Sequence, residues 1–149
     1  VKKILQPSKS LADYNTVSDA DVVIMRYAHV LLMIAEAENE VNGPTEKALK
    51  AINAVRTRSH QPAIDGTGLT QAELRERIRN EWRVETCFEG LRYFQLKRWK
   101  QLQQVVDGVV DPAYPSYIKV VKPAFEFFPL PQGEIDKAHG VLVQDPNYQ

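Results

Sequence analysis

The chain has 149 residues, of which 44% are hydrophobic and 26% charged, a composition typical of a globular protein. Its 19 basic and 19 acidic side chains give a formal charge of zero, so no nucleic-acid partner is expected. The single cysteine excludes an internal disulfide, and no apolar run reaches the roughly 20 residues that cross a bilayer. We expect one domain over residues 1–149. Because the chain begins at Val1 rather than Met, we expect it to be a piece of a longer protein.

Two helices are predicted in the first part of the chain. Residues 1–21 are expected to be irregular, because polar loop-forming side chains are frequent there. Hydrophobic periodicity predicts a helix over residues 24–42, which Gly43-Pro44 ends, and a second helix over residues 45–58. The short turn between them predicts an antiparallel hairpin.

A third helical segment is predicted over residues 70–104. Thr70 and Glu73 have the spacing of a capping box, in which the hydroxyl and the carboxylate each accept a hydrogen bond from a free backbone N–H. The helix that they open is predicted to continue to Gly90, and the sequence remains helical in character beyond that glycine.

Prolines are frequent after Asp107 and exclude long helices there. Short strands are possible at residues 117–122 and 125–128, and one helical turn at residues 134–138. The expected fold class is therefore mainly all-α: a helical hairpin and a long third helix, followed by a Pro-rich irregular C-terminal tail with short strands.

Three glutamates lie on the apolar side of the predicted third helix. With Leu74 at 0°, the helical repeat places Glu81, Glu85 and Glu89 at about 340°, 20° and 60°, around Ile78 at about 40°. A carboxylate that faces a core must be paired, because unpaired burial costs several kcal/mol. The plausible partners are Arg26, Arg56, Arg58 and Arg92, of which Arg56 and Arg92 are favoured.

The three acids allow two interpretations. In one, two of them are the acid and the base of a glycoside hydrolase. In the other, they form a buried network with arginines that fixes the register of the helices. The network is favoured, because acid–base catalysis needs carboxylates in opposed environments around an open cleft.

No other residues form a catalytic or metal-binding pattern, and neither a metal nor a cofactor is expected. His29, His60 and His139 are too dispersed for a metal site and are expected at the surface or in loops. Cys87 is expected to be a small core residue. Two aromatics between prolines are a speculative sugar-stacking platform, although such side chains more often pack on the core: Tyr114 and Tyr117.

Three segments, in order and at similar spacing, resemble the SusD/RagB family over about residues 20–149. The first runs from Arg26 to Ala37 and then to Arg58, the second from Ile78 to Trp99, and the third from Phe128 to Tyr148. The positions that match the family pattern, carried over as structural signature residues, are Arg26, Glu36, Asn53, Arg56, Arg58, Glu81, Arg83, Glu85, Glu89, Gly90, Arg92, Arg98, Trp99, Pro129, Pro131 and Glu134.

The chain departs from the family pattern at four places. His29 stands where Glu is common, Trp82 where Arg is usual, and Gln95 where Asp usually follows the aromatic pair. Ala138-His139 stands at the usual Asn-Pro. These changes concern local hydrogen bonds rather than the resemblance as a whole.

The resemblance implies a surface-exposed lipoprotein of a Bacteroidetes-type outer membrane, of which this chain is the C-terminal portion without the anchor. It implies a tetratricopeptide-like scaffold that is not an enzyme. It also implies capture of glycans, starch among them, or other nutrients for a SusC-like TonB-dependent transporter. The family's ligand-contacting aromatics lie mostly upstream, so no ligand residue is carried over.

Two other functions remain open from the sequence. A helical-repeat scaffold that recruits another protein explains the hairpin but not the Pro-rich ending. A glycoside hydrolase that uses Glu81 and Glu85 is less favoured.

Overall fold

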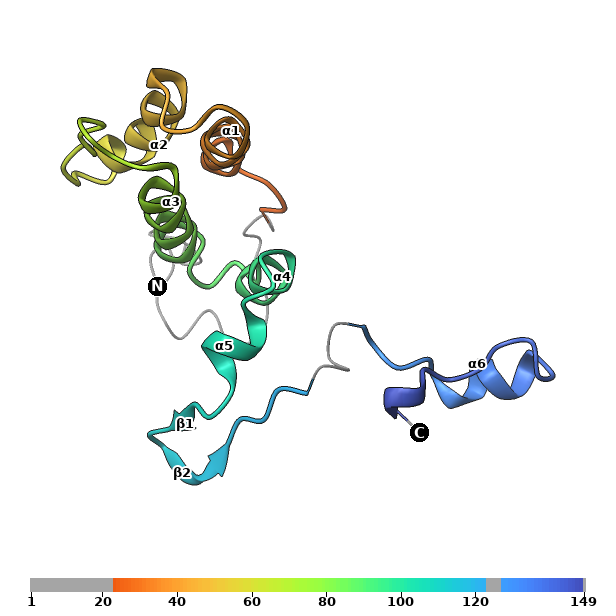
Figure 1. Ribbon diagram of the computed structural model, residues 1–149. Helices are drawn as coiled ribbons and strands as arrows, with labels where there is room; N and C mark the ends of the chain where they lie inside the picture. The colour runs from red at the N-terminus through yellow and green to blue at the C-terminus, as the bar shows by residue number, and fades with distance from the viewer. Residues whose placement is uncertain (1–22, 123–126, 149) are drawn as a thin grey trace, which may run out of the picture. The chain divides into compact units, whose positions relative to one another are not determined.

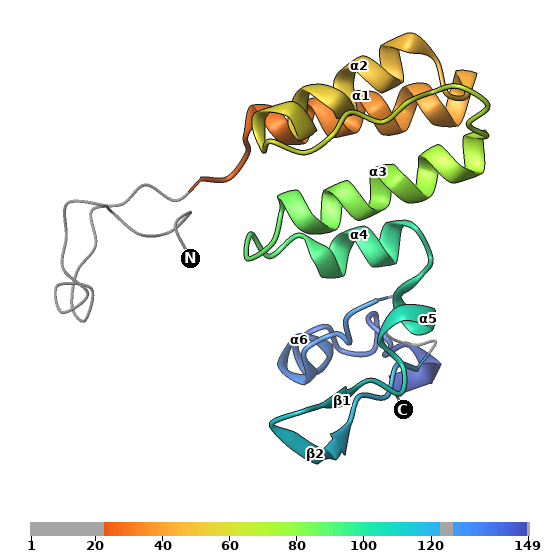
Figure 2. The same cartoon turned by 90° about the vertical axis from the view of Figure 1, so that its left-hand side faces the viewer.

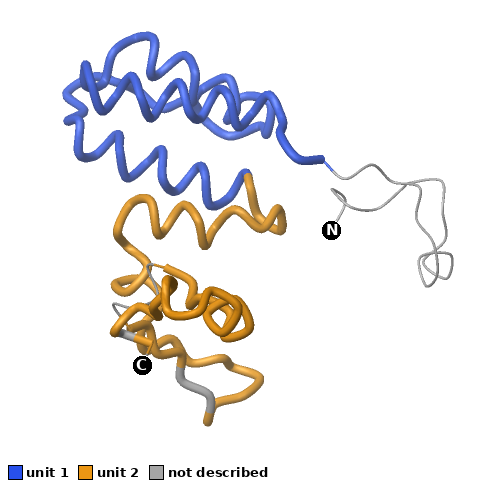
Figure 3. The backbone as a smooth tube through the Cα atoms, turned by 90° about the vertical axis from the view of Figure 1, so that its right-hand side faces the viewer, with its two compact units in different colours: residues 1–85 blue, residues 86–149 orange. Residues whose placement is uncertain are grey.

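The computed structural model describes residues 23–122 and 127–148, and these are mostly helical. The chain divides into two compact units, a first unit over Val1–Glu85 and a second unit over Thr86–Gln149 (Figure 3). Each unit is described by itself. The expected mainly helical fold class is confirmed, while the expectation of a single domain stays a prediction. Among the described residues, no helix combines the length and the apolar character needed to span a membrane.

The first unit begins with the predicted hairpin, α1 (Tyr27–Asn42) and α2 (Glu46–Arg58), which lie side by side in Figure 2. Gly43 ends α1 with a φ of 79°, a conformation that glycine adopts without steric cost. Thr45 caps α2, since its hydroxyl accepts a hydrogen bond from the Ala48 backbone N–H at 3.3 Å.

Helix α3 (Gln71–Glu85) packs mainly against α1. The predicted capping box is confirmed: the Thr70 N–H donates to Glu73 Oε2 at 2.8 Å, and the Glu73 N–H donates to Thr70 Oγ1 at 3.3 Å. The loop before this box is held by Asn53 of α2, whose side-chain amide donates to the Ile64 carbonyl at 3.0 Å. The Ile64 N–H donates back to Asn53 Oδ1 at 2.7 Å.

The core of the first unit lies among these three helices and is built from one apolar face of each. Alanines occupy several of the buried positions of α1 and α2, and larger side chains from all three helices fill the rest of the core. The buried apolar residues are Ala28, Leu32 and Ala35 of α1, Ala48, Ala51, Ile52 and Val55 of α2, Ile64 of the loop, and Leu74, Ile78 and Trp82 of α3.

The third helical segment was predicted to be more continuous than it is in the structure. In the structure it is three helices, of which α3 ends at Glu85, followed by α4 (Arg92–Arg98) and α5 (Leu102–Val106). Phe88 and Gly90 have φ values of 66° and 74° between the first two. A left-handed backbone cannot continue a right-handed helix, and Gly90 is the residue that was predicted to interrupt it.

The second unit continues with a two-stranded antiparallel sheet, β1 (Val110–Asp111) and β2 (Tyr114–Ile118), visible in Figure 1. The register pairs Val110 with Ile118 and Asp111 with Tyr114. The expected strand at 117–122 is thus shifted toward the N-terminus. The helical turn expected at 134–138 is α6 (Gln132–Lys137), and a 3-10 helix, η3 (Pro146–Tyr148), follows.

Several sequence expectations fall outside the described residues or are wrong. The irregular segment at 1–21 and half of the possible strand at 125–128 lie outside them, and residues 127–128 are not in a strand. His29 is buried at 4% exposure rather than at the surface, because its ring packs against Trp82 with 6.0 Å between centroids. Cys87 is exposed rather than in the core, since it follows the end of α3 in a turn.

We expect Asn53→Ala to lower the free energy of unfolding by about 2 kcal/mol, because both hydrogen bonds to Ile64 are lost and leave polar backbone atoms unpaired at a buried residue. Urea denaturation measures this loss. The matched control is Asn80→Ala on the exposed side of α3, where the expected change is within about 0.5 kcal/mol. Equal effects of the two substitutions would contradict the role of Asn53.

Candidate functional site

The most distinctive polar feature of the first unit is a pair of buried glutamates on α3. Glu81 and Glu85 are 5% and 6% exposed, on the same side as the buried Leu74 and Ile78. Their burial was predicted from helical spacing and is confirmed. Their arginine partners come from segments that are distant in sequence.

Glu81 is bound by Arg56, one of the two predicted partners. Arg56 Nη1 donates to Glu81 Oε2 at 2.7 Å. The Nε of the same guanidinium donates to the Pro62 carbonyl at 2.8 Å, in the loop that follows α2. One arginine therefore ties the end of α2 both to α3 and to the loop between them.

Glu85 is bound by two arginines at once. Arg26 Nη1 donates to Oε1 and Arg58 Nη2 donates to Oε2, each at 2.6 Å. Arg26 Nη2 also donates to the backbone carbonyl of Glu85 at 3.0 Å, which satisfies an acceptor at the C-terminal end of α3. Together, Arg26, Arg56, Arg58, Glu81 and Glu85 form what we call the arginine–glutamate network.

The side-chain carboxyl group of Glu85 is more stable in its charged form than in its protonated form. Desolvation by burial raises the pKa of its carboxyl, but the hydrogen bonds from Arg58 and Arg26, with the attraction of their charges, lower it more. The net pKa is lower than the ordinary value of 4.5. A carboxyl group with this pKa is a poor general acid near neutral pH, because it holds no proton to give.

The geometry therefore disfavours a pair of catalytic carboxylates. Glu81 and Glu85 both bind arginines and are both buried, whereas acid–base catalysis needs opposed environments around an open cleft. The expectation of three stacked acids on one helix is wrong for Glu89, since α3 ends at Glu85. Glu89 lies in the turn that follows and is half-buried.

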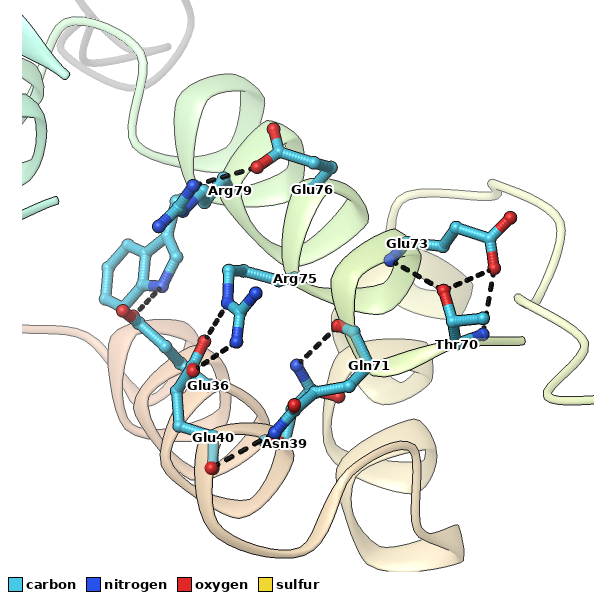
Figure 4. Close-up of polar contacts among 10 residues, drawn as sticks. Glu36, Asn39, Glu40, Thr70, Gln71, Glu73, Arg75, Glu76 and Arg79 are labelled. Atoms are coloured by element: carbon cyan, nitrogen blue, oxygen red, sulfur yellow. Dashed lines mark hydrogen bonds and ion pairs between the residues drawn. The ribbon is translucent and has the colours of Figure 1, made fainter.

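A second set of polar contacts joins α1 to α3 and was not foreseen from the sequence (Figure 4). Asn39 Nδ2 donates to the Gln71 carbonyl at 3.0 Å, and Gln71 Nε2 donates to the Asn39 carbonyl at 2.7 Å. Arg75 forms a bidentate pair with Glu40. The sequence signal was available for Asn39, which follows Leu32 by seven residues and Ala35 by four and so belongs to the buried stripe of α1.

Most of the remaining signature residues lie at the surface or in the second unit, and Glu36 is half-buried on α1. Arg83 is exposed on α3, and Arg98 stacks on the Trp99 ring with 5.3 Å between its guanidinium carbon and the ring centroid. Pro131 precedes α6, in which Glu134 pairs with Lys137 at 2.9 Å. Arg92 lies in α4, so its proposed pairing with a glutamate of α3 stays a prediction.

The speculative sugar platform is only partly described. Tyr114 is 69% exposed at the start of β2, and the side chain of Tyr117 lies outside the described part of the structure. Among the described residues, no group of three histidines, cysteines or acids is arranged to hold a metal ion.

Comparison with known proteins adds independent observations. A family model described as the SusD family matches residues 2–148. SusD-like protein P2 of Formosa agariphila is 31% identical over 143 residues, which cover 88% of this chain and 26% of that protein. SusD-like protein P25 of the same organism is 42% identical over 89 residues, which cover 58% of this chain and 17% of that protein.

Solved structures are similar as well. A SusD-like protein from Bacteroides fragilis aligns with a TM-score of 0.72 and 31% identity, over 85% of this chain and 26% of that chain. Surface glycan-binding protein A from Bacteroides thetaiotaomicron aligns with a TM-score of 0.68 and 29% identity, over 84% of this chain and 24% of that chain. The chain therefore spans between about a sixth and a quarter of the length of these relatives.

We expect Glu85→Ala to lower the free energy of unfolding by about 3 kcal/mol, because it removes the carboxylate that holds Arg26 and Arg58. The matched control is Glu76→Ala on the same helix, where an exposed pair with Arg79 is worth less than about 0.5 kcal/mol. Chemical denaturation measures both. A loss below about 0.5 kcal/mol for Glu85→Ala would show that the network does not stabilise the fold.

The contribution of Glu85 should also depend on pH. Its pKa is lower in the folded protein than the ordinary value of 4.5, so its stabilising effect is complete above that value and is lost as the pH falls through the folded pKa. We expect the difference in unfolding free energy between the protein and its Glu85→Gln variant to be constant near neutral pH and to shrink below about pH 4.5. A difference that does not change down to about pH 3 would contradict the lowered pKa.

Proposed function

The chain belongs to the SusD family, and we propose that it is part of a nutrient-binding protein that captures glycans and delivers them to a TonB-dependent, SusC-like outer-membrane transporter. The match over residues 2–148 carries this proposal. A structural relative that is named as a surface glycan-binding protein supports the choice of glycans as the nutrient. Because the chain spans about a quarter of its relatives, the proposal concerns the longer protein that contains it.

Within that protein, we propose that this segment is a scaffold rather than the ligand site. The arginine–glutamate network fixes three helices of the first unit relative to one another, which suits a support for binding loops elsewhere. The acids of the network are held as ion pairs, which supports a protein that binds its ligand without chemical conversion. We further propose that the parent protein is a lipoprotein on the outer surface of the outer membrane.

An alternative function is a helical-repeat scaffold that recruits another protein. One observation favours it: Tyr27, Ile34 and Val41 follow one another at seven-residue intervals along α1 and are 74%, 38% and 80% exposed. Recruitment of a protein in the absence of any glycan binding by the parent would favour this alternative.

Calorimetry of the full-length protein against a panel of oligosaccharides tests the leading proposal. We expect the full-length protein to bind at least one member of the panel and this chain alone to bind none or only weakly. We expect Tyr114→Ala/Tyr117→Ala in the full-length protein to leave that affinity within about twofold. Loss of binding in this double variant would place the ligand site in this segment instead.

Two further outcomes would overturn parts of the proposal. Hydrolysis of any glycan, lost in a folded Glu81→Gln or Glu85→Gln variant, would establish an enzyme. The transporter partner is tested by affinity purification of the full-length protein from detergent-solubilised outer membranes, where we expect a TonB-dependent transporter to co-purify. Its absence, when other outer-membrane complexes survive the same extraction, would contradict this partner.

A further inference from the structure

The second unit contains a pocket of about 470 Å³, which we call the aromatic pocket. This volume lies within the range of about 300–1,000 Å³ that is usual for small-molecule sites. Helices α4 and α5 form one side, and the residues before α6 together with η3 form another. The six lining residues on which the argument depends are Arg92, Tyr93, Leu102, Val106, Phe128 and Tyr148.

The walls of the aromatic pocket are poorly suited to a sugar. Its lining is dominated by aromatic and aliphatic side chains. One of its few polar groups is already used, because the Tyr148 hydroxyl donates a hydrogen bond to the Phe127 carbonyl at 2.6 Å. A carbohydrate would lose hydration of its hydroxyl groups there without gaining enough partners. An aliphatic chain or an aromatic ring would instead replace water against apolar walls.

A lysine lies beside two aromatic rings of the aromatic pocket. Lys97 Nζ lies 5.4 Å from the Tyr93 ring centroid and 5.3 Å from the Phe128 ring centroid, and both rings line the pocket. Arg92 is a second basic residue in the lining, and none of the lining residues that the structure describes is acidic. In the described part of the chain, the contacts of the Lys97 ammonium are these two rings, so its three donors remain available to a carboxylate.

We propose that the aromatic pocket binds an amphiphilic anion, a carboxylate with an aliphatic chain or an aromatic ring, whose apolar part lies between the aromatic walls and whose carboxylate meets Lys97. The apolar lining favours a ligand with an aliphatic or aromatic part, and the Lys97 ammonium beside Tyr93 and Phe128 favours a ligand with a negatively charged group. This ligand class differs from the glycans of the proposed function, and the pocket lies within the second unit alone.

Calorimetry with decanoate and with 1-decanol, both kept below the concentrations at which they aggregate, tests this proposal in the full-length protein. We expect decanoate to bind and Lys97→Met to weaken it about tenfold, because that change removes the charge and keeps the apolar stem. 1-Decanol should bind the protein and Lys97→Met equally. The control Lys119→Met, at an exposed lysine that does not line the pocket, should leave the affinity for decanoate unchanged.

A second variant tests the location. Val106→Trp fills the aromatic pocket and should abolish binding of both ligands, with circular dichroism and the melting temperature confirming that the protein is folded. No binding of decanoate by the full-length protein overturns the proposal, as does an equal loss of decanoate and 1-decanol in Lys97→Met. Oligosaccharide binding, measured on the same preparations, shows separately whether the proposed function holds.

Discussion

One carboxylate, that of Glu85, accepts hydrogen bonds at 2.6 Å from both Arg26 and Arg58 and so joins three segments of the first unit. Arg26 immediately precedes α1, Arg58 is the last residue of α2, and Glu85 is the last residue of α3. A buried ion pair is weak evidence for net stability, because desolvation offsets much of the attraction. The ion pairs of Glu85 instead specify how the helices are aligned, because any other register of the three helices would leave charges buried and unpaired.

The alignment of α1 and α3 is fixed by the ion pairs of Glu85 at one end of these helices and by hydrogen bonds at the other end. Asn39, near the end of α1, exchanges hydrogen bonds with Gln71 at the start of α3. Because Arg26 at the start of α1 binds the end of α3, the two helices run antiparallel and are tied at both ends. Apolar packing fills the length between the ties, and non-directional packing alone would tolerate a shift of one helix along the other.

Helical periodicity predicted the first unit well because its signal is local. The hairpin, the capping box and the buried side of α3 all depend on residues within a turn or two of one another. The pairing of Arg26 and Arg58 with Glu85 depends on how segments distant in sequence meet, which periodicity does not report. The end of α3 was also missed, since the positive φ of Phe88 is a conformation that a bulky side chain rarely adopts.

At three positions where the sequence resemblance indicates a departure from the SusD pattern, the structure shows which contacts the side chains of this chain make. His29 stands where Glu is common, and its Nδ1 accepts a hydrogen bond from the Arg26 N–H at 3.3 Å, so it still supplies an acceptor at the start of α1. Trp82 stands where Arg is usual, and its Nε1 still supplies a donor, to Glu36 Oε2 at 3.1 Å. His29 therefore supplies an acceptor within the first turn of α1, and Trp82 supplies a donor that joins α3 to α1.

Gln95, in place of Asp, is different: it is 6% exposed, and its Oε1 finds no donor among the described residues. A neutral amide left with an unpaired oxygen costs less than a buried carboxylate in the same position would. Gln95 carries no charge, and its buried oxygen has no donor among the described residues.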